Sequence, residues 1–249
     1  MKLRLFFLLT GFVFSGSVLG ASGGVELMHA NTNLSDKASL QRGARTFVNY
    51  CLSCHSASYM RYNRIGADLG ISDEVLKKNL MFGTEKTGDT MTIAMTPESA
   101  EQYFGGAVPP DLSVTARSRG VDWLYTYFMT FYRDPVRPYG VNNLAFKDVG
   151  MPHVLWELQG WKRPVYEDVK HEDGSVTQKI VELEMQTPGS QSEKEYERTV
   201  RDLVNFMDYI GEPIKLKRQK IGFWTILYLL IILLLIVYLM KKVYWKDVH

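Results

Sequence analysis

The sequence contains only two cysteines and five histidines among its 249 residues, which excludes a disulfide-rich scaffold. It also lacks an excess of one charge, because 29 basic and 27 acidic residues give a formal net charge of +2. Without a large positive excess the chain cannot neutralise many phosphates, which argues against a nucleic-acid-binding protein. Hydrophobic residues make up 46% of the chain, so a disordered or collagen-like protein is excluded as well.

Two stretches at the ends of the chain hold a large share of the apolar residues. Residues 1–21 are typical of a secretory signal peptide, because Lys2 and Arg4 precede an apolar run at 5–14 and small residues follow. An uncleaved N-terminal anchor is the alternative, but the apolar run is short for a membrane span. A mitochondrial transit peptide would be richer in Arg and Ser. The leader therefore indicates a bacterial exported protein, with cleavage near residue 20 or 21.

Residues 221–240 contain no charged side chain and are predicted to form a transmembrane helix. Twenty residues at about 1.5 Å each span roughly 30 Å, the thickness of the hydrocarbon core of a bilayer. A buried core helix is the alternative, which the flanking lysines and terminal aromatic residues disfavour. Basic residues flank the span on both sides and do not select an orientation. The signal peptide selects the orientation, because it exports residues 22–220 and leaves 241–249 in the cytoplasm. The exported residues have a net charge of −2.

Both cysteines belong to one motif, in which Cys51, Cys54 and His55 form C-x-x-C-H. This is the attachment signature of a c-type haem: the two thiols add to the haem vinyl groups, and the histidine reaches the iron. A thioredoxin-like site would require a strand before the motif, where the sequence indicates a helix, and a zinc site would require further ligands. The sequence therefore predicts one covalently attached haem c. The alternative is that the C-x-x-C-H motif occurs by chance.

Two amphipathic stripes predict helices near the two ends of the exported domain. Ser35 is a candidate N-cap for the first helix, whose apolar positions are Leu40, Ala44, Phe47 and Cys51. The apolar positions of the second helix are Tyr196, Val200, Leu203, Met207 and Ile210. Gly43 and Phe47 resemble the small and aromatic pair on the first helix of class I cytochromes c, whose first and last helices cross at a small residue.

The residues alone leave the second axial ligand of the iron open. Met151 and Met95 both lie beside glycine or proline in segments that favour loops, where no helix constrains the thioether. Met60 is too close to the attachment motif to reach the opposite haem face. Met207 belongs to the second apolar stripe, and His153 is expected at the surface.

Several segments together resemble the cytochrome c1 family of the cytochrome bc1 complex. After the C-x-x-C-H motif come Ala107–Ser113 (AVPPDLS), Arg117–Arg119 (RSR), Val149–Pro152 (VGMP) and Asp202–Pro213 (DLVNFMDYIGEP), followed by a basic lead into a single span. The resemblance covers roughly residues 30–245. The haem motif is common to many cytochromes, whereas the ordered set of segments is specific.

The resemblance implies roles for single residues. Met151 would be the sixth iron ligand, Pro109 and Pro110 would pack against the haem, and Arg117 would pair with a haem propionate. Arg119 is a second candidate for the propionate contact, and a solvated surface charge is the alternative for both arginines.

The implied fold class is mainly α: a class I cytochrome c-like haem domain with long insertions, plus one C-terminal transmembrane helix. The insertions are expected at 66–108 and 162–192. Within the second, Val165–Val169 and Val176–Leu183 flank an Asp-Gly turn signal and predict a β-hairpin.

The expected function is electron transfer, without bond-making chemistry on a substrate. The resemblance implies a subunit of a dimeric bc1 complex in the bacterial inner membrane, with its haem domain in the periplasm. It would take electrons from the Rieske iron–sulfur protein, beside cytochrome b, and pass them to a cytochrome c. The rival functions are a tethered cytochrome serving another oxidase or reductase, a haem enzyme or sensor with an open iron site, and a thiol–disulfide oxidoreductase.

One charged segment bears on the electron acceptor. Residues 165–197 contain nine acidic and three basic residues, a local net charge of −6. Such a segment would attract a basic cytochrome c and raise its association rate at low salt. An ordinary solvated insertion is an equally good interpretation.

Overall fold

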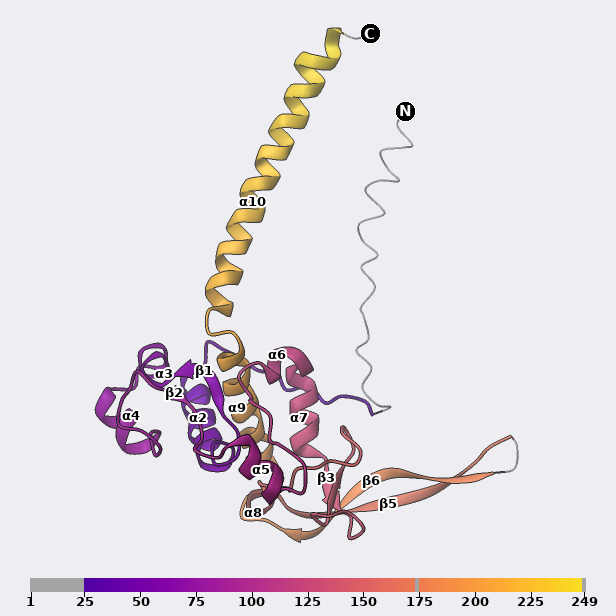
Figure 1. The fold of residues 1–249 in the computed structure, drawn as a ribbon. Coiled ribbons are helices and arrows are strands. Elements are labelled where there is room, and N and C mark those ends of the chain that lie inside the picture. The colour runs from indigo at the N-terminus through magenta and orange to yellow at the C-terminus, as the bar shows by residue number, and fades with distance from the viewer. Residues whose placement is uncertain (1–24, 173–174, 248–249) are drawn as a thin grey trace.

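Helices account for about half of the chain in the computed structural model, which describes residues 25–172 and 175–247. The predicted signal peptide lies outside the described residues. The helices are α2 (Lys37–Tyr50), α3 (Tyr62–Leu69), α4 (Asp73–Asn79), α5 (Pro97–Tyr103), α6 (Thr115–Arg119), α7 (Val121–Met129), α8 (Trp156–Gln159), α9 (Glu193–Gly211) and α10 (Lys215–Leu239). Figure 1 shows a body of short elements, from which α10 and one β-hairpin project in different directions.

The core of the body forms where α2 and α9 pack together. Both predicted apolar stripes are buried. At Gly43 of α2 the two backbones approach so closely that a Cβ would lie 2.0 Å from the carbonyl oxygen of Asp202 on α9. One turn further along α2, the Phe47 ring contacts Phe206 of α9, with centroids 5.5 Å apart. The predicted pair of crossing helices is therefore confirmed, although Asp36 caps α2 in place of Ser35.

Three antiparallel two-stranded sheets complete the body. They pair β1 (Ala57–Arg61) with β2 (Thr90–Met91), β3 (Phe131–Arg133) with β4 (Val141–Asn143), and β5 (Gly160–Lys170) with β6 (Val176–Pro188). The β5–β6 pair confirms the predicted hairpin, and its strands are longer than the sequence pattern indicated. Residues 173 and 174, which carry the turn signal, lie outside the described residues. The first predicted insertion is less irregular than expected, because 66–108 includes α4 and α5.

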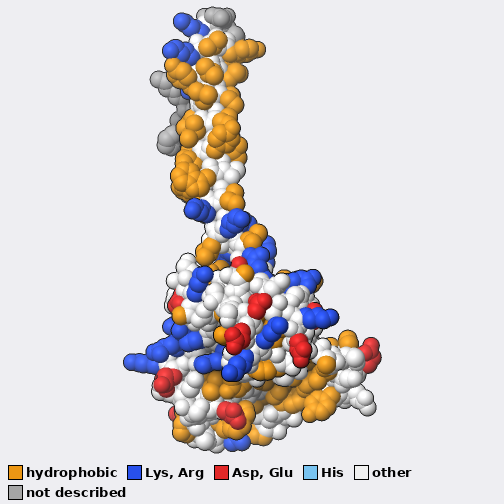
Figure 2. Space-filling view, turned by 90° about the vertical axis from the view of Figure 1, so that its left-hand side faces the viewer, with side chains coloured by type: hydrophobic (Ala, Val, Ile, Leu, Met, Phe, Trp, Pro, Cys, Tyr) orange, Lys and Arg blue, Asp and Glu red, His pale blue; other side chains and the backbone are white. Residues whose placement is uncertain are grey.

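Helix α10 leaves the body directly after Glu212 and has no buried residue. With the turns that follow it to Tyr244, it is long and apolar enough to cross a membrane, and it is the single such helix in the described residues. It begins at Lys215, six residues before the predicted span, and thus includes the basic lead. Figure 2 shows hydrophobic side chains along its length, with Lys and Arg at both ends. These features fit a single-pass membrane anchor.

Candidate haem-binding site

The predicted site residues gather around one cavity of about 340 Å³ in the body. Its walls are largely apolar and come from segments far apart in the sequence. They are the end of α2 with the cysteine motif, the loop before α6 and α6 itself, helix α7, the loop before α8, and Met207 of α9. The cavity is lined by seven of the eight predicted residues: Cys51, Cys54, His55, Pro109, Pro110, Arg119 and Met151.

The cysteine motif reaches the cavity because the chain folds back after α2. The amide of Cys54 donates to the Cys51 carbonyl at 3.1 Å, and the amide of His55 donates to the same oxygen at 2.9 Å. No disulfide joins Cys51 and Cys54, and burial raises the pKa of the Cys51 thiol to about 12. A thiol so hard to ionise is a poor nucleophile for disulfide exchange. The segment before the motif is a helix, as predicted, which also disfavours a thioredoxin-like site.

The ring of His55 is held by a backbone carbonyl. Its Nδ1 lies 2.7 Å from the carbonyl oxygen of Pro110, so the ring donates from this nitrogen and leaves Nε2 as the free ligand atom. Burial lowers the pKa of His55, which the Pro110 hydrogen bond and the nearby Asp111 charge only partly oppose. A neutral imidazole with one nitrogen oriented by a carbonyl is suited to ligate iron.

Two methionines line the cavity, Met151 and Met207, whereas Met95 does not. Met207 is buried in the core with a relative exposure of 1%. Met151 lies in the loop before α8, where its Sδ accepts a hydrogen bond at 3.4 Å from the hydroxyl of Tyr127 on α7. Of the two loop candidates left open by the sequence, only Met151 faces the cavity.

The prediction that His153 lies at the surface is wrong. Its relative exposure is 5%, and its ring stacks on Phe131 of β3 with centroids 4.7 Å apart. Burial lowers the pKa of His153 to about 4, so the ring is neutral at pH 7. This histidine is a core residue two positions after Met151.

The structure separates the two arginines that follow the Pro-Pro segment. Arg117 of α6 lies beside Gly211 of α9 and does not line the cavity. Arg119 lines it, with its guanidinium carbon 5.0 Å from the ring centroid of Trp123 and 5.8 Å from that of Phe146. Within the described residues, Arg119 forms no salt bridge. A cation with no carboxylate partner at the edge of an apolar cavity is suited to a carboxylate of a bound group.

These features fit a haem c. The cavity offers two thiols and an oriented imidazole from one turn, a thioether from another segment, apolar walls and one available cation. Sequence reasoning missed the contribution of α7, which supplies Trp123, Tyr127 and Phe128 to the walls. The signal for it was the aromatic content of Val121–Met129 (VDWLYTYFM).

Comparisons with known proteins also indicate a c-type cytochrome. The model of the Cytochrome C1 family matches residues 28–248. A protein of Allochromatium vinosum named cytochrome c1 is 50% identical over 94% of each chain. A protein of Nitrosomonas europaea named ammonia monooxygenase gamma subunit is 46% identical over 98% of each chain. A cytochrome c1 of Blastochloris viridis is 27% identical over 86% of this chain and 82% of its own.

Proposed function

This chain belongs to the cytochrome c1 family, and from that premise we propose that it is the c-type haem electron-transfer subunit of a cytochrome bc1 complex. The observation that carries the proposal is the convergence of Cys51, Cys54, His55 and Met151 on one largely apolar cavity. When bound there, haem c supplies a one-electron redox couple. The chain itself performs no bond-making chemistry on a substrate.

The residues divide the work of holding this group. Cys51 and Cys54 would anchor it through two thioethers, formed by addition of the thiols to the haem vinyl groups, and His55 and Met151 would ligate the iron. Ligation by a histidine and a methionine raises the potential relative to two nitrogen ligands, and it leaves no open position for oxygen. The apolar walls exclude water from the haem. The surroundings of the iron therefore change little when it passes between its two oxidation states, which favours electron transfer.

The rim of the cavity supplies the remaining contacts. Pro109 and Pro110 form part of the wall beside His55 and pack against the group. Arg119 neutralises a propionate, a role supported by its position at the cavity and by its stacking on Trp123. Arg117 is the weaker candidate for the propionate contact, because it does not line the cavity.

The setting follows from the family and from α10. We propose that residues 1–21 are a cleaved signal peptide, that 22–220 form a periplasmic haem domain, and that 221–240 cross the inner membrane, with 241–249 in the cytoplasm. Electrons arrive from a Rieske iron–sulfur protein held with cytochrome b, in a dimeric complex, and leave to a soluble or membrane-bound cytochrome c. Quinol is oxidised elsewhere in the complex.

The name of the Nitrosomonas europaea relative raises a second possibility, a subunit of a monooxygenase. The family match and the names of the other relatives favour electron transfer. With both His55 and Met151 as ligands, the iron would not be open to oxygen activation.

Purification of the tagged chain from its native membrane distinguishes these functions. We expect cytochrome b and a Rieske protein to copurify, and quinol to reduce the haem in the purified complex. Copurification with a monooxygenase, or a reduced spectrum that shifts when carbon monoxide is added, would contradict the proposal.

A further inference from the structure

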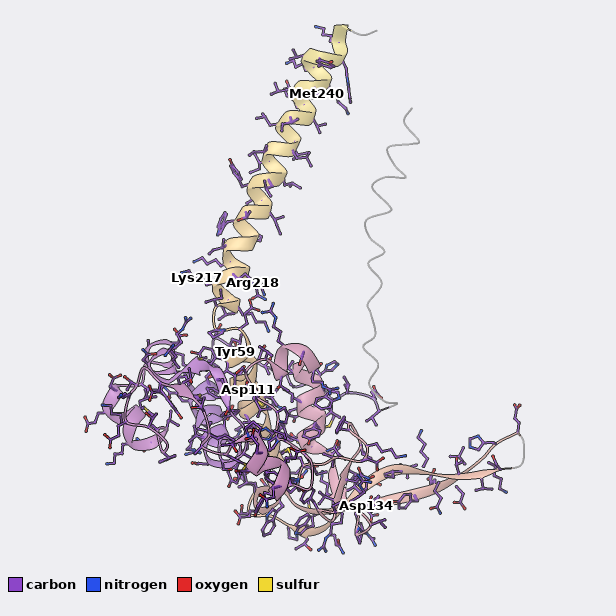
Figure 3. All side chains as sticks on the ribbon, in the orientation of Figure 1. Tyr59, Asp111, Asp134, Lys217, Arg218 and Met240 are labelled. Carbon is purple, nitrogen blue, oxygen red and sulfur yellow. The ribbon has the colours of Figure 1, made fainter. Side chains whose placement is uncertain are left out.

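A short network of hydrogen bonds joins residues 56–59, which follow the C-x-x-C-H motif, to residues 111–113, which follow Pro109 and Pro110. The amide of Leu112 donates to the Ser56 carbonyl at 2.8 Å, and the amide of Tyr59 donates to Ser113 Oγ at 3.1 Å. Asp111 forms hydrogen bonds with both of these segments. Figure 3 shows Asp111 close to Tyr59, on the side of the body from which α10 leaves.

The Asp111 carboxylate accepts three hydrogen bonds in this network. One oxygen, Oδ2, accepts from the amide and the hydroxyl of Ser58 at 2.9 and 2.7 Å. The other, Oδ1, accepts from the amide of Ser113 at 2.8 Å. Desolvation alone would raise the pKa of Asp111, but the hydrogen bonds from Ser113 and Ser58 outweigh it and hold the pKa below its ordinary value. The side chain is therefore an ionised acceptor, which suits three donors.

The residue just before Asp111 supplies the carbonyl that holds the His55 ring. Proline fixes φ at Pro110, and the same ring restricts Pro109 before it. The direction of the Pro110 carbonyl then depends on the one remaining free backbone angle, ψ of Pro110, the rotation about its Cα–C bond. By binding Ser58 and Ser113 on both sides, the Asp111 side chain fixes that rotation.

We propose that Asp111 is a positioning residue for His55: through Ser58 and Ser113 it fixes the Pro110 carbonyl and thereby sets the ligand strength of the histidine. This inference rests on the proposed role of His55 as an iron ligand. A firm Nδ1–H···O bond orients the ring and makes the imidazole a stronger donor, which stabilises ferric iron. A loosened carbonyl weakens the donor, so the midpoint potential rises.

The test compares three variants of the full-length haem protein. Asp111→Asn keeps the shape of the side chain but offers only one acceptor oxygen. Ser58→Ala removes the 2.7 Å bond without changing any charge. Asp134→Asn is the matched control, because Asp134 also ties a loop, through Asn142 at 3.0 Å and the amide of Val136 at 3.3 Å, but does not line the cavity.

The readouts are the midpoint potential, the electron paramagnetic resonance spectrum of the ferric haem, and haem content. We expect Asp111→Asn to favour reduction several-fold, where tenfold corresponds to about 59 mV for one electron. Ser58→Ala should shift the potential in the same direction by less. Both variants should change the electron paramagnetic resonance spectrum. Asp134→Asn should change neither the midpoint potential nor this spectrum.

Three results would overturn the inference: an unchanged Asp111→Asn protein, an unchanged Ser58→Ala protein, or an equal shift in Asp134→Asn. The second would mean that only the lost charge of Asp111 acts on the haem. Failure of the haem-binding role on which this inference rests is recognised separately, because the wild-type chain would then contain no covalent haem.

Discussion

At the scale of single residues, the assignment of the sixth ligand depends on which of two cavity methionines binds iron. Met151 lies in a loop and Met207 in the packed core. We expect Met151→Ala to open the sixth position, so that the reduced haem binds carbon monoxide and its potential falls. Met207→Leu, a substitution of similar volume, should cost less than about 1.5 kcal/mol and leave the haem closed to carbon monoxide. The reverse pattern would assign the ligand to Met207.

The hydroxyl of Tyr127 is the second residue-scale feature with a measurable effect. It donates to Met151 Sδ at 3.4 Å, while the Tyr127 carbonyl accepts from Asn143 Nδ2 at 2.6 Å and fixes the helix end. The hydrogen bond withdraws electron density from the sulfur. We therefore expect Tyr127→Phe to lower the midpoint potential, with a change in the free energy of unfolding of about 1 kcal/mol at most. A potential equal to that of the wild type in a redox titration would show that this bond does not tune the ligand.

Single residues also show where sequence reasoning stops. The C-x-x-C-H spacing is local, so Cys51, Cys54 and His55 could be placed together without a structure. His153 could not, because its burial depends on a ring from β3 that lies 22 positions earlier in the chain. The choice between Arg117 and Arg119 depends on how the five-residue helix α6 is rotated against α9, and no repeat in so short a segment indicates that rotation.

At the scale of elements, the crossing of α2 and α9 is the contact on which the haem domain depends most. A Cβ at Gly43 would lie 2.0 Å from a backbone oxygen of α9, which cannot rotate away. We expect Gly43→Ala to lower the free energy of unfolding by more than about 2 kcal/mol, because the helices must separate. The same substitution at Gly222 of α10, where nothing lies within 4 Å, serves as the control in thermal unfolding. Equal melting temperatures for the two variants would contradict this account.

The β5–β6 hairpin carries much of the acidic segment 165–197 away from the body (Figure 1). Part of the charge is compensated locally, since Arg163 and Glu184 form an ion pair at 2.6 Å on facing strands. Glu167, Asp168 and Glu182 form no salt bridge with any described residue. If the segment steers a basic acceptor, replacing these three acids by their amides will flatten the salt dependence of cytochrome c reduction. An unchanged salt dependence would leave the hairpin as a solvated insertion.

The elements were predictable to different degrees. The α2 and α9 stripes and the hairpin follow from local periodicity, and all three are confirmed. The short helices α4 and α5 were not predicted. Each has only seven residues, too few for a recurring apolar face, and each is marked mainly by its cap, Ser72 for α4 and Thr96 for α5.

At the scale of the whole molecule, the chain combines a cavity-bearing body with an apolar helix that leaves it after Glu212. Two ion pairs lie at the junction between them, Lys215 with Asp208 at 2.9 Å and Arg218 with Glu212. Helix α10 fits a membrane anchor, and the body carries the cavity in which the haem would bind.

The central claim is that both cysteines of this chain are consumed by one haem held for electron transfer. The most direct measurement is the mass of the mature chain from the membrane, combined with a pyridine haemochrome spectrum and a thiol titration under denaturing conditions. We predict a chain that begins near residue 21, carries one haem through two thioether bonds, and has no titratable thiol. Recovery of two free thiols, or haem that is extracted into acidic acetone, would contradict the account.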